Sequence, residues 1–175
     1  HLRAQCGADL QLKWVVVRNP GKPRVLIPSE AEVVTDLDLV VEDPEVEIAI
    51  ELMGGVDQAF EAMCNLLRAG KHVVTANKAV LAEHGPELFE VAHENQRTVC
   101  FEAAVAGGIP IIAAVSQSLA ANKIRSISGI LNGTSNYILS AMHDRGISYD
   151  SALQQAQVKG LDRKSTRLNS SHTVI

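Results

Sequence analysis

A lysine stands where a β-branched run meets an expected helix. In residues 73–79, VVTANKA, Asn77 can cap that helix through its side chain, and Lys78 then falls in the first turn. The helix dipole disfavours a cation there, which favours the neutral amine and makes Lys78 a candidate proton acceptor. Most lysine side chains extend into water, so the position by itself fits a solvated residue equally well.

Arg18 ends the β-rich run 12–18, LKWVVVR, which reads as the second strand of a nucleotide-binding sheet. An acid at that place binds the ribose hydroxyls of NAD, whereas an arginine suits the 2′-phosphate of NADP. Lys22 and Arg24 add positive charge nearby. The run therefore predicts a preference for NADP over NAD, the alternative being a solvated arginine at a strand end.

Two other kinds of site are not indicated. No G-x-G-x-x-G occurs, so a dinucleotide-binding domain would need its first strand and phosphate loop upstream of His1. Cys6, Cys64 and Cys100 form no C-x-x-C and are odd in number, which predicts neither a disulfide framework nor a zinc site. We expect reduced and mostly buried thiols.

The elements that must position these residues alternate between strand and helix, which predicts the α/β class. Residues 31–39 fit a short strand or a short helix, and the second helix is expected to be interrupted near Gly85 and Pro86. Strands are expected over 12–18, 47–53, 72–75 and 98–102, and helices over 58–69 and 79–95. Short connections favour a doubly wound parallel sheet, here a partial Rossmann domain over 1–102. The loops after its strands should then form one ligand cleft.

After Glu102 the pattern changes to the start of an α+β region over 103–161. A small-residue loop leads to Pro110, which suits the first turn of a helix over 110–121. Alternating residues predict a half-solvated strand over 124–131. Helices are expected over 135–145 and 148–159, the second capped by Ser148.

The last fourteen residues differ from the rest. Residues 162–175 show no helical or strand period, and DRKSTRLNSSH, read back through one choice of codons, resembles a widely used sequencing-library adapter. We therefore expect 162–175 to be a non-native tail and the parent sequence to be interrupted near Leu161.

Composition limits the partners. The formal net charge is −4 and only 3% of residues are aromatic, which argues against a nucleic-acid surface. The apolar runs are far shorter than the roughly 20 residues that cross a bilayer, and the first residues do not resemble a signal peptide. We expect a cytoplasmic protein with a small-molecule partner, no nucleic acid and no membrane.

Four motifs, in this order and spacing, resemble the homoserine dehydrogenase family over essentially all of residues 10–160. They are ELMGG at 51–55, GKHVVTANKAVLAEHG at 70–85, FEAAVAGGIPII at 101–112 and GILNGTSNYIL at 129–139. The family interconverts L-homoserine and L-aspartate 4-semialdehyde with NAD or NADP, on the route to threonine, methionine and isoleucine. The resemblance also implies a homodimer or higher homo-oligomer, with 103–161 belonging to a substrate-binding and dimerisation domain.

The resemblance implies roles for individual residues. Lys78 would move the substrate's hydroxyl proton as hydride passes to the nicotinamide. Thr75 and Ala76 would line the nicotinamide pocket, and Gly54 and Gly55 would let the cofactor approach the backbone. Substrate-side contacts would come from Gly133 and Thr134. A monovalent cation, usually sodium, would be held mainly by carbonyl oxygens of Glu102, Val105, Gly107 and Ile109. By the residues alone these last two groups fit a strand-to-helix connection and a tight turn.

The chain departs from the family pattern near both of its ends. The family's phosphate loop would precede His1, and its second catalytic lysine and substrate carboxylates would follow Gly160, so we expect the chain by itself to be inactive. Another NAD(P)-linked Rossmann dehydrogenase of semialdehyde type would need a nucleophilic cysteine at a helix start, whereas Cys64 falls mid-helix and Cys100 mid-strand. A non-catalytic nucleotide-binding module would not need Lys78.

Overall fold

The computed structural model describes residues 7–24, 26–130, 133–161 and 173–174. They form two compact units, one containing the described residues up to Ala120 together with Thr173–Val174, the other residues 121–161. This division falls later in the chain than the one expected at 102/103. The expected non-native tail lies outside the described residues except for Thr173 and Val174.

The first unit alternates strands with helices, as predicted. Its elements are β1 (Trp14–Val17), β2 (Glu32–Val34), α2 (Asp38–Glu42), β3 (Ile48–Glu51), α3 (Asp57–Arg68), β4 (His72–Thr75), α4 (Lys78–Glu94), β5 (Val99–Cys100), the 3₁₀ turn η1 (Glu102–Ala104), α5 (Ile111–Ala113) and the π-helical turn η2 (Ala114–Ser118). Both alternatives for 31–39 are present in part, since β2 and α2 share that stretch. The helix expected over 110–121 is shorter than predicted.

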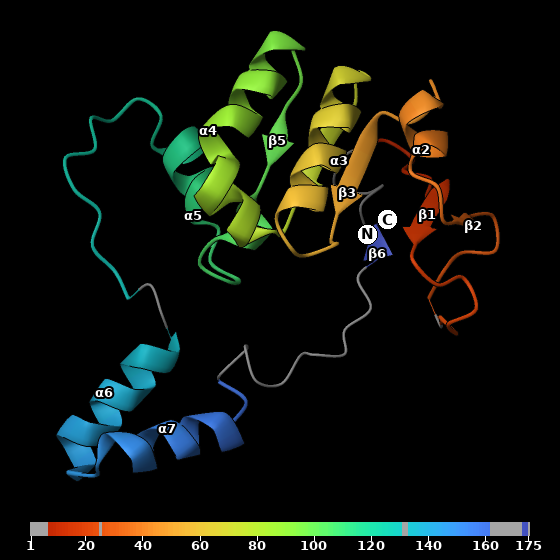
Figure 1. The fold of residues 1–175 in the computed structure, drawn as a ribbon. Helices are drawn as coiled ribbons and strands as arrows, with labels where there is room; N and C mark the ends of the chain where they lie inside the picture. The colour runs from red at the N-terminus through yellow and green to blue at the C-terminus, as the bar shows by residue number, and fades with distance from the viewer. Residues whose placement is uncertain (1–6, 25, 131–132, 162–172, 175) are drawn as a thin grey trace. The chain divides into compact units, whose positions relative to one another are not determined.

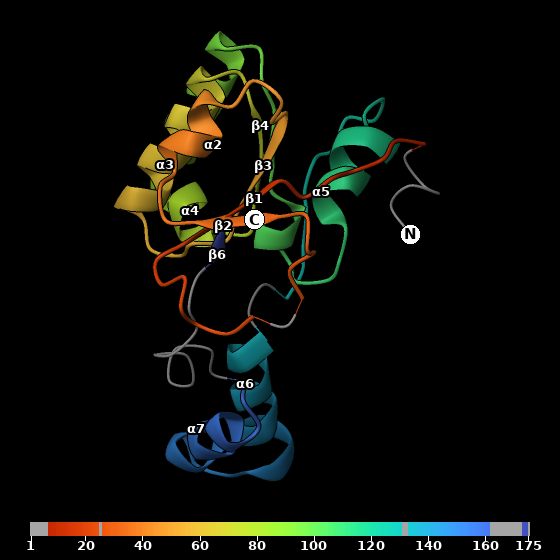
Figure 2. The ribbon, with the colours of Figure 1, turned by 90° about the vertical axis from the view of Figure 1, so that its right-hand side faces the viewer.

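The strands form two parallel groups. In one, the order is β3-β4-β5, and in the other β1 pairs with β2. The two-residue strand β6 (Thr173–Val174) pairs antiparallel with β1. Helices α2, α3 and α4 cover one face of the strands and α5 lies on the other (Figures 1 and 2). The predicted doubly wound α/β class is therefore confirmed.

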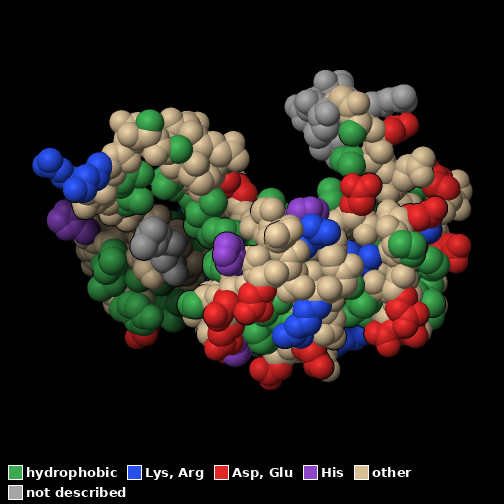
Figure 3. Space-filling view, turned by 90° about the horizontal axis from the view of Figure 1, so that it is seen from above, with side chains coloured by type: hydrophobic (Ala, Val, Ile, Leu, Met, Phe, Trp, Pro, Cys, Tyr) green, Lys and Arg blue, Asp and Glu red, His purple; other side chains and the backbone are tan. Residues whose placement is uncertain are grey.

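Acidic side chains slightly outnumber basic ones, 20 Asp and Glu against 16 Lys and Arg. Asp and Glu side chains gather in several groups on the face that Figure 3 presents, consistent with the net charge of −4. Within the described part of the chain, no helix is long and apolar enough to span a membrane.

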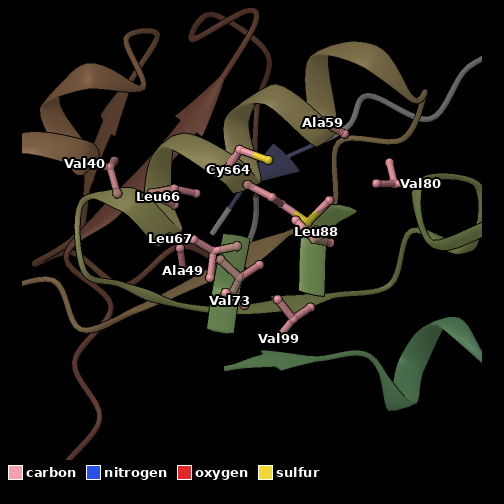
Figure 4. Packing of buried hydrophobic residues seen from close by; sticks show 12 residues of the cluster. Val40, Ala49, Ala59, Cys64, Leu66, Leu67, Val73, Val80, Leu88 and Val99 are labelled. Atoms are coloured by element: carbon pink, nitrogen blue, oxygen red, sulfur yellow. The ribbon is translucent and has the colours of Figure 1, made fainter. Parts of the chain in front are cut away.

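The core lies between α3, α4 and the strands. Met63, Leu66 and Leu67 project from one stripe of α3 and are at most 1% exposed. Figure 4 shows Leu67 close to Ala49 and Val73, which belong to neighbouring strands. Burying each such aliphatic side chain contributes about 1.5–3 kcal/mol. This packing fixes α3 and α4 against the strands whose ends carry the candidate site.

The end of α3 and the interruption of α4 occur where the neighbouring residues predict them. Gly70 comes shortly after α3 and has a φ of +81°. Its amide donates to the Leu67 carbonyl, and the amide of Lys71 donates to the Leu66 carbonyl. This pair of bonds is the Schellman termination expected of a glycine after a helix. The predicted interruption of α4 is present at His84, whose φ of −127° is non-helical.

The second unit is a pair of helices, α6 (Gly133–Arg145) and α7 (Tyr149–Val158), with Ser148 capping α7 as predicted. The strand expected over 124–131 is wrong for residues 124–130, which have no regular structure; Leu131 lies outside the described residues. A strand needs a neighbour for its amides. The described residues of this unit offer only helices, and Ile127 and Ile130 are left 66% and 73% exposed.

Candidate active site

The ends of β3 and β4 lie side by side, because the two strands are parallel and in register. Glu51, the last residue of β3, pairs with Thr75, the last residue of β4. The segments that follow, including Gly54 and Lys78, therefore begin at one edge of the sheet. They enclose a cavity of about 300 Å³ lined by Glu51, Leu52, Gly54, Ala76, Asn77, Lys78 and Ala79.

Lys78 is the first residue of α4 and its side chain is exposed toward this cavity region. The predicted cap is present, since the amide of Val80 donates to Asn77 Oδ1 at 3.3 Å. The same side chain reaches across the cleft, because Asn77 Nδ2 donates to the Gly55 carbonyl at 2.8 Å. Asn77 thus joins the start of the helix that carries Lys78 to the glycine turn.

The glycine turn needs its glycines for backbone reasons. Gly54 and Gly55 have φ of +71° and +75°, a region that residues with a Cβ adopt at a cost. A Cβ on Gly55 would meet no atom within 4 Å. Open space next to a reversed backbone suits the close approach of a flat ligand.

Thr75 and Ala76, predicted together, are placed differently. Ala76 lines the cavity, whereas Thr75 is fully buried. The Thr75 hydroxyl donates to Glu51 Oε2 at 2.6 Å and accepts from the Asn77 amide at 2.9 Å. Thr75 is therefore not among the residues that line the cavity.

Glu51 is the polar residue that sequence reasoning missed. Its side chain is 1% exposed, and its second oxygen accepts from the Met53 amide at 2.6 Å. A signal was present in the alternation of EIAIELM, where Glu51 falls on the buried side of the strand with Ala49. A carboxylate in that register needs donors inside the protein.

Arg18 follows β1 directly and is exposed, with Nη2 donating to Gln58 Oε1 in the first turn of α3 at 3.1 Å. It is not part of the cavity lining. Arg24, expected to add charge for a phosphate, donates to the carbonyls of Asn19 and Lys22. The Arg24 side chain therefore binds carbonyls of the loop that contains it. Arg18 is the better placed of the two side chains to bind an anion.

The loop predicted to hold a cation reverses direction at Ala106 and Gly107, with φ of +53° and +63°. The Glu102 carboxylate accepts from the amides of Ile112 and Ala113 at 2.9 and 2.8 Å. The Glu102 carboxylate is thus bound to the start of the next helix, and its carbonyl accepts from the Val105 amide at 3.2 Å. In the described residues no group of three or more His, Cys, Asp or Glu side chains could hold a metal ion. A set of carbonyl oxygens nevertheless fits a hard cation.

Gly133 and Thr134 begin α6 in the second unit, where the Thr134 hydroxyl donates to the Leu161 carbonyl. The helix thus starts before the position expected from Ser135. Asn132, the first residue of the predicted turn, lies outside the described residues.

Neither cysteine in the described part of the chain supplies a nucleophile to the cavity. Cys64 is buried in α3, and burial raises the pKa of its thiol. Cys100 is exposed in β5, and Cys6 lies outside the described residues. The cavity lining contains neither described cysteine.

A charged cluster holds the opposite end of β3. Asp43 accepts from Lys13 at 2.7 Å and from Trp14 Nε1 at 2.6 Å, and these bonds, Lys13 first, lower the pKa of its carboxyl to about 2. Lys71 is 2% exposed and its Nζ donates to the carbonyls of Asp43 and Val46, while burial lowers its pKa. This cluster anchors the loop between α2 and β3.

Comparison with known proteins agrees with this geometry. Residues 1–102 match the family model described as homoserine dehydrogenase, NAD binding domain, and residues 110–167 match the one described as homoserine dehydrogenase. The homoserine dehydrogenase of Synechocystis sp. is 49% identical over 152 residues, which are 86% of this chain and 35% of that protein.

Solved structures give the same result. A homoserine dehydrogenase of S. aureus at pH 7.5 matches with a TM-score of 0.74 and 33% identity, covering 94% of this chain and 38% of that one. A hyperthermophilic archaeal homoserine dehydrogenase in complex with NADPH matches with a TM-score of 0.66 and 29% identity, covering 79% and 43%. The chain spans about a third of the length of the curated relatives it matches. With a nucleotide-binding match over more than half of its residues, and with Lys78 and the glycine turn at one edge of a parallel sheet, the chain belongs to the homoserine dehydrogenase family.

Proposed function

We propose that this chain carries the nucleotide-binding side of an enzyme that interconverts L-homoserine and L-aspartate 4-semialdehyde in the biosynthesis of threonine, methionine and isoleucine. The observation that carries the proposal is the cavity at the ends of β3 and β4, where Lys78 stands beside a reversed glycine backbone. An amine there is within reach of a ligand that lies on Gly54 and Gly55.

Residues in and around the cavity would have separate parts in this chemistry. A bound nicotinamide supplies the hydride acceptor or donor. Gly54, Gly55 and Ala76 let its ring lie against backbone, and Thr75 contributes from behind the cavity by bonding the Asn77 amide. Lys78 accepts the hydroxyl proton of homoserine as hydride leaves the substrate carbon, and returns it in the reverse direction.

The proposed cofactor is NADP, with NAD as the second choice. Arg18 supports it, because an exposed guanidinium at the end of a nucleotide-binding strand can pair with a 2′-phosphate in two parallel hydrogen bonds. The archaeal relative was solved with NADPH.

A sodium ion and the substrate complete the proposal. The ion would be held by the carbonyl oxygens of Glu102, Val105, Gly107 and Ile109, and the substrate would be contacted by Gly133 and Thr134. We also propose a cytoplasmic homodimer or higher homo-oligomer with a small-molecule substrate as its partner, and neither nucleic acid nor a membrane.

A chimera tests the function. Residues 7–161 replace the matching segment of the Synechocystis sp. enzyme, and homoserine oxidation is followed by the absorbance of NADPH. We expect turnover in the chimera and a loss of about 10²–10⁴-fold in kcat for Lys78→Ala, the range that general acid–base groups supply. Lys123→Ala, an exposed lysine outside the cavity, is the matched control.

Two results would contradict the proposal. A folded chimera that binds NADPH but does not oxidise homoserine would favour a non-catalytic nucleotide-binding module. A Lys78→Ala chimera as active as the Lys123→Ala chimera would remove Lys78 from the chemistry.

A further inference from the structure

We propose that Glu51 is a positioning residue for this site: through the Thr75 hydroxyl, its buried carboxylate fixes the Asn77 backbone from which Lys78 and the cap of α4 project. The proposal rests on the proposed function for its catalytic consequence. Its structural part concerns three hydrogen bonds and can be tested without any turnover.

The hydrogen bonds run in one direction only. The Asn77 amide must donate, so the Thr75 oxygen accepts there and the Thr75 proton points to Glu51 Oε2. The Met53 amide must also donate, so Glu51 Oε1 accepts as well. A side chain that accepts at both ends is needed between Met53 and Thr75, and the two oxygens of Glu51 meet that need.

The chain of bonds adds side-chain links among the ends of β3 and β4, which strand pairing already aligns, the glycine turn and the start of α4. Glu51 takes the amide that begins the glycine turn, Thr75 takes the amide of Asn77, and Asn77 binds the Gly55 carbonyl that ends the turn. The three residues are at most 8% exposed, so a substitution that removes one partner leaves a largely buried polar group without its hydrogen bond. The turn and the start of α4 are therefore held as one unit.

This arrangement matters for Lys78 because it is the next residue after Asn77. A displacement of about 1 Å at a reacting group can lower a rate by roughly 10²-fold. Glu51 would act on the reaction only through Thr75 and Asn77, without donating or accepting a proton of the substrate.

Glutamine is a sharp probe of the carboxylate. Its amide has one acceptor and one donor end, so Glu51→Gln sets an N–H against the Met53 amide or leaves the Thr75 proton without an acceptor. Thr75→Val removes the relay at nearly constant volume, and Thr75→Ser keeps the hydroxyl. Glu61→Gln, at an exposed position of α3, is the matched control.

The first measurement is residue-resolved amide hydrogen exchange in the 175-residue chain. We expect exchange at Asn77 or Met53 to rise at least tenfold in Glu51→Gln, since a buried hydrogen bond is lost. Thr75→Val should give the same rise at Asn77 and Thr75→Ser should reverse most of it. The amides of Val73 and Leu88 report on the core and should not change.

The second measurement is kinetic and uses the chimera described above. We expect Glu51→Gln and Thr75→Val to lower kcat about tenfold or more with KM for NADP within about twofold, and Thr75→Ser to recover most of kcat. Three results would each overturn the proposal. The first is unchanged exchange at Asn77 and Met53, and the second is an equal acceleration of exchange at Val73 and Leu88. The third is an unchanged kcat in a variant whose Asn77 or Met53 amide exchanges faster. An inactive unsubstituted chimera would count against the proposed function instead, and exchange would then decide the role of Glu51.

Discussion

Asn77 makes two separable contributions to the first unit, and two substitutions distinguish them. Its Oδ1 caps α4 and its Nδ2 bonds the Gly55 carbonyl, and the residue is 8% exposed. Asn77→Ala removes both. A lost cap costs about 1 kcal/mol and a lost buried hydrogen bond about 1 kcal/mol more. The expected loss is about 2 kcal/mol, or roughly 8 °C in Tm for a unit of this size.

Asn77→Asp separates the two contributions. Aspartate caps a helix as well as asparagine does and carries a charge that the helix dipole favours. It cannot donate to Gly55, so about 1 kcal/mol should still be lost. The expected order of stability is therefore wild type, then Asn77→Asp, then Asn77→Ala.

Urea unfolding followed by the fluorescence of Trp14, the single tryptophan, measures these free energies. Asn65→Ala, at an exposed position of α3, is the control and should change stability by less than about 0.5 kcal/mol. An Asn77→Asp variant as stable as wild type would show that the Gly55 bond contributes nothing. Equal losses in the two Asn77 variants would refute the cap.

Three further predictions concern charged residues. Lys71→Met should destabilise the chain by about 1–3 kcal/mol in urea unfolding, because two buried carbonyls lose their donor, whereas the exposed Arg68→Met should be nearly neutral. The Asp43 carboxyl has a pKa of about 2 in the folded chain against 3.8 ordinarily, so the stability that it contributes is complete above about pH 4 and is lost as pH falls toward 2. Acid unfolding should therefore show a smaller loss of stability over that window in Asp43→Asn than in the unsubstituted chain. An identical loss in the two proteins would contradict the assignment. Arg18→Ala should lower the ratio of kcat/KM for NADP to that for NAD by about tenfold or more in the chimera, since a charge-assisted contact is removed, and an unchanged ratio would exclude Arg18 from phosphate binding.

Features set by neighbouring residues could be predicted from the sequence. The β-branched run ending at Thr75, the Asn77 cap and the Gly70 termination depend on a few consecutive residues, and all are present where expected. These local signals placed Lys78 at the start of a helix. The parallel class followed from the alternation of such elements.

Features that depend on distant partners could not be predicted in this way. The bond between Glu51 and Thr75 joins residues 24 apart through strand register, which periodicity does not supply. The predicted strand over 124–131 failed for the opposite reason: its alternation is real, but a strand exists only with a neighbour. Arg24 was expected to add positive charge near Arg18, and its bonds to the carbonyls of Asn19 and Lys22 depend on a loop geometry that the sequence pattern does not supply.

The position of β3 has a practical consequence for handling this chain. Among the described strands, β3 bonds to β4 on one side only, and Ile48 and Ile50 on its outer face are 49% and 37% exposed. An unpaired strand edge next to exposed isoleucines is a template for a strand of another molecule. Concentrated samples should therefore self-associate through β3, and solubility during purification will depend on keeping that edge covered.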